Sequence, residues 1–284
     1  MIRPSRPGDE AALAKLWQIA FGDTMEDINR FFSRLYQPGD AIVWADGDKI
    51  ASAIYLLDAG RSTLPDGRDF PTSYAYALAT LPTDRGRGLG AEVTRAALAH
   101  SFASGFSLNV ICPAEESLFP YYTRLGYTDV LPIIQGQTYR AEIQSDDFMN
   151  QVMSISFSAY FRLRLALLPP FSTGFTPAYL RYVAEMGEAS GAGLFQLTLG
   201  GQTGLASVEW RDSSLFVREI LPASLAGQGV QALMAHLGAA SALFRTAPDS
   251  NCGSSPPPRP FALLTHAGHE NLTADTLYFP FALD

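Results

Sequence analysis

The sequence has few of the residues that mark disulfide-stapled, metal-bound or membrane-embedded proteins. Only two of its 284 residues are cysteines, Cys112 and Cys252, and they stand far apart outside any Cys/His cluster. Neither a disulfide framework nor a structural zinc site is therefore expected. No stretch approaches about 18 uninterrupted apolar residues, and charges stand where a signal peptide would have its apolar region. We expect no membrane segment and, by default, a cytoplasmic location.

Positive charge is also scarce. The chain has 20 Lys and Arg against 28 Asp and Glu, a formal net charge of −8, and only two lysines, Lys15 and Lys49. A nucleic-acid surface needs clustered cations, so no nucleic-acid partner is expected. An acidic surface instead weakly favours a cationic partner such as an amine.

What the sequence does have is enough apolar residues for real cores. Hydrophobic residues make up 47% of the chain and charged residues 17%, which excludes a disordered protein. A chain of 284 residues exceeds the usual size of one small domain. We expect two domains, residues 1–145 and 146–284.

The first half alternates helical and strand patterns. Apolar residues at helical spacing predict a helix from Pro7 to Phe21, with Asp9 accepting backbone N–H bonds at its start. The next predicted elements are a helix at residues 27–36, strands at 41–46, 49–60 and 70–82, and a glycine loop at 83–88. They are followed by a helix at 88–104, a strand at 106–113, a helix at 116–127 and a strand at 138–144. This order indicates a mixed α/β layer with a ligand edge at the glycine loop.

The second half repeats that outline. Helices are predicted at residues 158–168 and 176–190, three strands within 193–220, and a loop at 247–260. Between them, Leu221-Pro222 is followed by Gly227 and Gly229 and an amphipathic helix. Leu81-Pro82, Gly88 and Gly90 form the matching pattern in the first half, which indicates a shared architecture. No arginine precedes the second glycine pair.

The stretch LPTDRGRGLGAEVTRAALAH, from Leu81 to His100, has the composition of a phosphate-binding loop at the start of a helix. Glycines at 86, 88 and 90 clear side chains from the helix amides, and arginines at 85 and 87 add positive charge. The alternative for so short a glycine pattern is a tight turn that binds nothing. Neither the P-loop pattern nor the full dinucleotide fingerprint is present.

Two spaced motifs indicate the family. Arg85, Gly88 and Gly90 satisfy R-x-x-G-x-G, and the run from Tyr122 to Tyr127 satisfies Y-x-x-x-G-[FY]. Over about residues 1–140 the chain resembles the GNAT family of acyl-CoA-dependent N-acetyltransferases. The resemblance implies the mixed α/β acyl-CoA N-acyltransferase fold, followed by a second, degenerate GNAT-like domain.

The resemblance also implies where acetyl-CoA, the co-substrate, would bind. In the family the loop amides hold the diphosphate, and the preceding strand binds the pantetheine arm and polarises the thioester carbonyl. The tyrosine of the second motif protonates the departing thiolate. The matching residues here are Arg85, Gly86, Arg87, Gly88, Leu89 and Gly90 for the diphosphate, Leu78, Ala79, Thr80 and Leu81 for the pantetheine arm, and Tyr122 for the acid.

No residue identifies itself as the base that deprotonates the acceptor. Glu115 and Glu116 follow the fifth strand, although a solvated loop is the simpler interpretation. Tyr74 and Tyr76 alternate along the strand that enters the site, where they would either line an acceptor pocket or pack. Tyr121 is interpreted as a packing residue.

The histidines do not form a metal site by sequence, since His266 and His269 have ligand-like spacing but no third ligand. His100 is expected at the surface near a helix end. The terminal carboxylate of Asp284 is a weaker candidate for the base, because related three-domain acetyltransferases use their C-terminus in that role.

The hypothesis is thus an N-acetyltransferase that transfers the acetyl group of acetyl-CoA to a primary amine of a small molecule or peptide by direct attack. The alternative is a non-catalytic acyl-CoA-binding or structural module that has kept the fold. The acceptor and the oligomeric state are left open, although a homodimer is the commonest outcome for such chains.

Overall fold

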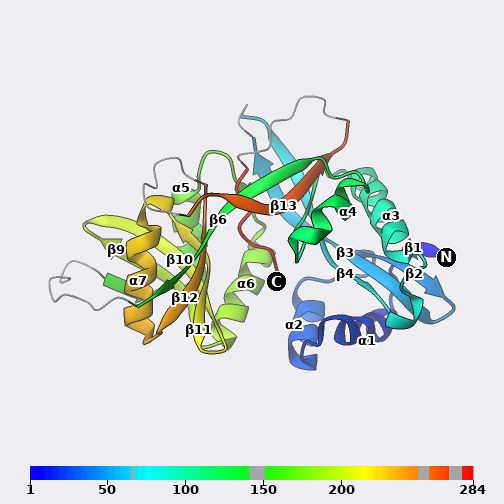
Figure 1. The fold of residues 1–284 in the computed structure, drawn as a ribbon, viewed down its shortest axis with the longest axis horizontal. Helices are drawn as coiled ribbons and strands as arrows, with labels where there is room; N and C mark the ends of the chain where they lie inside the picture. The colour runs from blue at the N-terminus through cyan, green and yellow to red at the C-terminus, as the bar shows by residue number, and fades with distance from the viewer. Residues whose placement is uncertain (65–66, 141–150, 249–255, 269–276, 284) are drawn as a thin grey trace. The chain divides into compact units, whose positions relative to one another are not determined.

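The structure is a computed structural model that describes residues 1–64, 67–140, 151–248, 256–268 and 277–283 (Figure 1). Its contacts gather into two compact units. Unit 1 consists of Met1–Ser62, Arg68–Val130 and Ala262–Leu272. Unit 2 consists of Thr63–Gly67, Leu131–Phe261 and Thr273–Asp284.

Unit 1 is built on a sheet with the strand order β1-β2-β3-β4-β5-β13. Strands β1, β2 and β3 pair antiparallel, β4 and β5 pair parallel, and β13 pairs antiparallel with β5. The mixed α/β layer predicted from the sequence is therefore confirmed. Its elements are β1 (Ile2–Pro4), α1 (Glu10–Phe21), α2 (Met25–Arg34), β2 (Ala41–Asp46), β3 (Lys49–Thr63), β4 (Asp69–Thr80), α3 (Leu89–Ala103), β5 (Leu108–Ile111), α4 (Phe119–Thr123) and β13 (Arg259–His266).

Helices cover both faces of the unit 1 sheet, with α1 and α2 on one side and α3 on the other (Figure 1). Successive residues of β3 show why, because side chains alternate between the faces of a strand. Ile54 and Leu56 join the apolar cluster under α3. Tyr55 packs instead against Trp17 of α1 and Phe31 of α2, with ring centroids 5.3 and 5.2 Å away.

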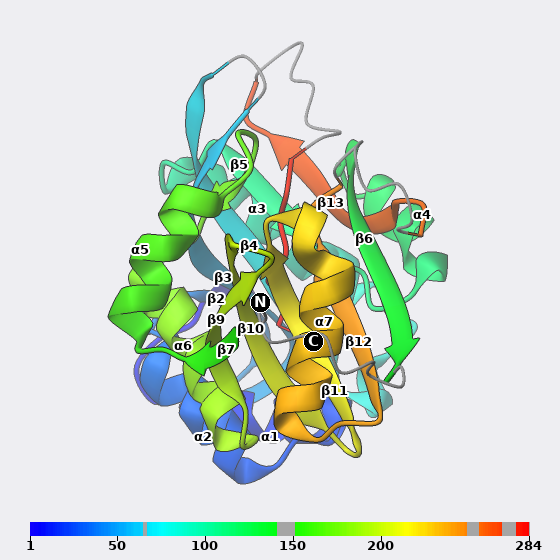
Figure 2. The ribbon, with the colours of Figure 1, turned by 90° about the vertical axis from the view of Figure 1, so that its left-hand side faces the viewer.

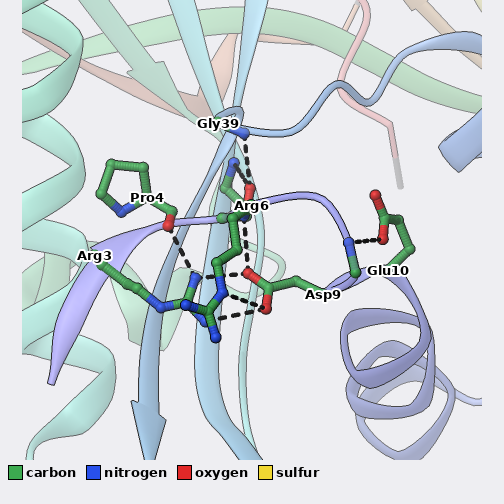
Figure 3. A network of polar contacts seen from close by, with 9 residues as sticks. Arg3, Pro4, Arg6, Asp9, Glu10 and Gly39 are labelled. Atoms are coloured by element: carbon green, nitrogen blue, oxygen red, sulfur yellow. Dashed lines mark hydrogen bonds and ion pairs between the residues drawn. The ribbon is translucent and has the colours of Figure 1, made fainter. Parts of the chain in front are cut away.

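The start of α1 is tied to β1 by Asp9 (Figure 3). The Asp9 carboxylate accepts from the Arg3 guanidinium at 2.6 and 3.0 Å and from the Arg6 backbone N–H at 2.9 Å. The bond from Arg3 holds the pKa of Asp9 below its usual value. Asp9 does accept a backbone N–H as predicted, but the donor is Arg6, which precedes the helix, and the Asp9 side chain makes no cap bond to α1.

Unit 2 has the strand order β6-β12-β11-β10-β9-β7, with β11 and β12 parallel. Helix α7 packs on β11 and β12 on one face (Figure 2), while α5 and α6 pack on β9 and β10. The elements are β6 (Asp129–Tyr139), β7 (Gln151–Ser154), α5 (Phe157–Leu167), β8 (Thr173–Gly174), α6 (Pro177–Ala189), β9 (Gly193–Leu199), β10 (Gln202–Arg211), β11 (Ser214–Leu221), α7 (Ala226–Leu237) and β12 (Ser241–Thr246).

The two units share an order of elements, as the sequence outline predicted. In each, a strand is followed by a short 3-10 turn, a helix and a parallel partner strand: β4, α3 and β5 in unit 1, and β11, α7 and β12 in unit 2. The strand beyond the parallel pair then comes from a distant part of the chain. β13 pairs with β5, and β6 pairs with β12.

Several strands differ from the sequence prediction, which misplaced β6 and did not include β7, β8, β12 or β13. The strand predicted at residues 138–144 is wrong in position, because β6 spans Asp129–Tyr139. The sequence pattern did not indicate β6 because the strand contains Pro132 and Gly136, and both residue types usually interrupt strands. β13 was not predicted at all, and it begins inside the loop expected up to Pro260. Residues 141–144 lie outside the described part of the chain.

Candidate active site

Strands β4 and β5 part at the point where the site would lie. Their parallel pairing runs from Thr72↔Leu108 to Ala75↔Ile111, and β5 ends there while β4 continues to Thr80. Two residues later Ala77 has a φ of 51°, a left-handed conformation that costs a non-glycine residue on the order of 1 kcal/mol. The end of β4 thus extends beyond its pairing with β5, and its backbone is irregular at Ala77.

The four residues expected to bind the pantetheine arm are anchored from β3. Ser52 donates its hydroxyl to the Ala79 carbonyl at 2.8 Å and lies 2.9 Å from the Thr80 hydroxyl. Leu81 donates its N–H to the Ala51 carbonyl at 2.9 Å, so that amide already has an acceptor. The Leu78 side chain packs on the cluster under α3. This anchoring holds the end of β4 in place.

The glycine loop forms an open turn before α3. Gly86 and Gly88 have φ values of 77° and 80°, and a Cβ added to either would meet no described atom within 4 Å. Leu89 is the first residue of α3, and the first α3 bond across this turn runs from the Glu92 N–H to the Gly88 carbonyl at 3.1 Å. The amides ahead of Glu92 therefore have no intrahelical acceptor and lie at the positive end of the helix dipole.

Asp84 holds the loop together. It is 4% exposed, and its carboxylate accepts from the Lys49 ammonium at 2.7 Å and from the Thr83 hydroxyl at 2.9 Å. Arg87 also pairs with it and lies over the Trp44 ring. The bond from Lys49 lowers the pKa of Asp84 most.

Arg85 has a separate partner, since its Nε donates to the Thr80 carbonyl at 3.3 Å. Both arginines of the loop therefore contact the protein itself in this structure, and both are exposed residues.

Two adjacent tyrosines on α4 complete the region. Tyr122 is 7% exposed and lies in the apolar cluster under α3, with Leu125 and Tyr127. Burial raises its pKa well above the ordinary phenol value. Tyr121 is half-buried, and its hydroxyl oxygen lies 3.4 Å from where a Cβ on Gly90 would be. Sequence reasoning interpreted Tyr121 only as a packing residue, because Tyr122 alone matches the motif.

The other candidates lie apart from this arrangement or pack. Glu115 and Glu116 are exposed. Tyr74 is 2% exposed, whereas the half-buried Tyr76 contacts Trp17 with ring centroids 5.5 Å apart. His100 lies in the last turn of α3. His266 ends β13, and His269 and Asp284 lie outside the described residues.

Within the described ranges, no three His, Cys, Asp or Glu side chains are grouped so as to hold a metal ion. None of the helices described here has the length and apolar character needed to cross a bilayer.

The matching helix of unit 2 starts differently. Helix α7 begins at Ala226, so Gly227 and Gly229 lie inside its first turns and do not form a loop ahead of it, in contrast to the sequence prediction. A Cβ on Gly229 would lie 2.5 Å from Ile220 Cδ1 and 3.0 Å from Leu197 Cδ1. Glycine is needed there because the helix packs closely on the sheet. At the matching Gly90 of unit 1 the nearest atom to a Cβ, the Tyr121 hydroxyl oxygen, lies 3.4 Å away.

Comparison with known proteins agrees with this geometry. Residues 1–130 match the family model of the acetyltransferase (GNAT) domain. A GCN5-related N-acetyltransferase from Anabaena variabilis superposes with a TM-score of 0.70 at 14% identity, covering 93% of this chain and 72% of that one. A probable N-acyltransferase from Enterococcus faecalis gives 0.67 at 12% identity, covering 93% and 72%.

A third solved structure, a tandem GNAT protein from the clavulanic acid biosynthesis pathway, is similar over nearly its whole length. It superposes with a TM-score of 0.55 at 14% identity, covering 95% of this chain and 99% of that one. At these identities the likeness shows the GNAT fold alone. No curated protein sequence matches the chain.

Proposed function

The chain belongs, through residues 1–130, to the GNAT acetyltransferase family, and on that basis we propose that it is an acetyl-CoA-dependent N-acetyltransferase. Its acceptor would be a primary amine of a small molecule or peptide. The observation that carries the proposal is the open turn at Gly86 and Gly88, at the positive end of α3 and directly after the end of β4. Such a turn suits a diphosphate. The end of β4, beyond its pairing with β5, would then carry the pantetheine arm.

The proposed reaction is a direct transfer. A neutral amine attacks the thioester carbonyl, whose oxygen gains charge and is stabilised by backbone N–H groups of residues 78–80. The tetrahedral intermediate then collapses, the C–S bond breaks, and the thiolate takes a proton from the Tyr122 hydroxyl. The phenol is protonated at neutral pH, and burial raises the pKa of Tyr122 further, so the proton to be transferred is present at the start of the reaction. We assign no residue as the base for the amine.

We also propose that the two predicted domains differ in function. Residues 1–145 carry the transferase site, and residues 146–284 form a GNAT-like domain without such a site. Support comes from the start of α7, which follows the 3-10 turn at Ala223–Leu225 directly and has no glycine loop ahead of it, whereas Gly86 and Gly88 precede α3.

The first test uses the open turn. Gly88→Ala should weaken CoA binding about 10- to 100-fold, because the methyl group enters the space before the α3 amides and the φ of 80° disfavours any Cβ. The measurement is calorimetric titration with CoA. Gly105→Ala is the matched control, since Gly105 has a φ of 92°, equally open surroundings and a place beyond the other end of α3. Equal affinities for the two variants, or no binding by the wild type, would remove the proposal's basis.

A second test addresses the scaffold of the loop. Asp84→Asn should weaken CoA binding by about tenfold, because Lys49 and Arg87 lose the carboxylate that holds the turn. Asp48→Asn removes the same charge from an exposed position and should leave affinity unchanged.

The pH dependence of this effect has a definite sign. The pKa of Asp84 is lowered in the folded protein, so the carboxylate stays charged at neutral pH and its stabilisation is lost only as pH falls through that lowered pKa. Wild-type CoA affinity should therefore show no loss due to Asp84 between about pH 5 and 8. A decline in that window that Asp84→Asn abolishes would contradict this.

The burial of Tyr122 also supports the alternative of a non-catalytic acyl-CoA-binding module, because a 7% exposed phenol has little access to a thiolate. Thiol release from acetyl-CoA over a panel of amines separates the two functions. Cofactor binding without release for any amine would favour the binding module.

A further inference from the structure

Tyr121 occupies a position that the proposed mechanism does not use. It lies on α4 beside Tyr122, with ring centroids 5.0 Å apart, but its hydroxyl extends toward the first turn of α3. The space above Gly90 is bounded by that hydroxyl at 3.4 Å, by the Thr80 hydroxyl at 3.5 Å and by Leu78 Cδ2 at 3.9 Å from the position of a Cβ. Tyr121 therefore lies where the end of β4 meets the start of α3.

The polar groups around this point are mostly donors. The Tyr121 hydroxyl has no hydrogen-bond partner within the described part of the chain. The Arg95 guanidinium, one turn further along α3, is near enough to act on Tyr121 electrostatically. The amides of the first turn of α3 face the same end. A half-buried phenol O–H without an acceptor, next to unpaired amides, is suited to an acceptor supplied by a ligand.

We propose that Tyr121 is a cofactor-binding residue whose hydroxyl donates a hydrogen bond to the phosphopantetheine part of acyl-CoA, at the junction between diphosphate and arm. The inference rests on the proposed function, since it needs the diphosphate at the start of α3 and the arm along β4. The two neighbouring tyrosines then have separate tasks: Tyr121 binds the cofactor and Tyr122 supplies the proton.

The position of Thr80 gives the reason for placing the contact at this junction. Its hydroxyl is held by Ser52 at 2.9 Å, on the strand that carries the pantetheine arm, and it borders the same space as Tyr121. A ligand atom in hydrogen-bond reach of both hydroxyls lies between the α3 amides and the end of β4. The adenosine end of the cofactor lies on the far side of the diphosphate from the arm and does not pass through this space.

The experiment compares two ligands on the full chain. Tyr121→Phe keeps the ring contact with Tyr122 and removes only the hydroxyl. By calorimetry it should weaken CoA binding about tenfold and leave binding of adenosine 3′,5′-bisphosphate, which lacks the pantetheine arm, within twofold. The kcat with saturating acetyl-CoA should stay within twofold. Tyr139→Phe, at an exposed tyrosine, controls for the substitution itself and should change neither affinity.

Three results would overturn the inference: CoA affinity within twofold of the wild type, equal losses for the two ligands, or a fall in kcat with CoA affinity retained. None of these three results concerns CoA binding by the wild type, so none of them contradicts the proposed function. Failure of the wild type to bind CoA would instead overturn the proposed function and this inference together.

Discussion

Replacing Tyr122 by phenylalanine should lower kcat about 100-fold or more while CoA affinity stays unchanged. General acid catalysis contributes about 100- to 10,000-fold, and the variant loses the acid but keeps a ring that packs under α3. Steady-state thiol release, with an amine from the panel that is turned over, measures kcat. Calorimetry with CoA measures binding on the same preparation.

The pH profile gives an independent check of this role. Burial raises the pKa of Tyr122, so its acid form persists and activity is lost only as pH rises through that raised pKa. The wild type should therefore show no decline due to Tyr122 below about pH 10, the ordinary phenol value. Unchanged turnover in Tyr122→Phe would reject the acid role. A parallel loss of CoA affinity would make Tyr122 a binding or packing residue.

A chain that ends after residue 145 should fail to fold into a stable unit 1. Such a chain lacks β13, which pairs with β5 through Leu263↔Ile111, Leu264↔Val110 and two further residue pairs. Leu263 and Leu264 are 1% and 0% exposed, and Leu263 belongs to the cluster under α3. Removing β13 uncovers that cluster and leaves the edge of β5 unpaired. Circular dichroism and size-exclusion chromatography should show an unfolded or aggregated product.

A point variant tests the same contact in the full chain. Leu263→Ala should lower the free energy of unfolding by about 2–5 kcal/mol, the usual cost of deleting a buried leucine side chain. Leu165→Ala is the matched control, because Leu165 is 57% exposed and its loss should cost under about 0.5 kcal/mol. A soluble, cooperatively folding product from residues 1–145, or equal costs for the two leucine variants, would show that unit 1 does not depend on β13.

Local patterns predicted much of unit 1. The turn at residues 46–48 joins β2 and β3, and the alanine-rich run after Gly88 forms α3, as expected from turn and helix signals that act over a few residues. The glycines of the loop were visible in the sequence, and the φ values of 77° at Gly86 and 80° at Gly88 explain why glycine stands there. Residues at fixed spacing in a short segment thus predicted the location of the proposed cofactor loop.

Local patterns did not predict contacts between distant segments. Gly229 and Gly90 stand at matching positions of the sequence outline, but only packing shows that a Cβ would lie 2.5 Å from Ile220 at the first and 3.4 Å from its nearest neighbour at the second. Tyr121 and Tyr122 are identical neighbours in the sequence. The direction of the short helix α4 decides that one hydroxyl reaches α3 while the other residue is buried.

By itself, then, the sequence determined the mixed α/β class, the repeated outline and the loop ahead of α3, since these follow from side-chain periodicity and backbone preferences within a few residues. Only the tertiary structure decided that β13 pairs with β5, that Gly229 packs closely on its sheet and that Tyr121 reaches Gly90. Leu263 and Ile111 illustrate the reason, because they pair although they lie far apart in the chain. The free energy of this contact comes from the burial of both side chains, and the local sequence pattern of either segment does not predict it.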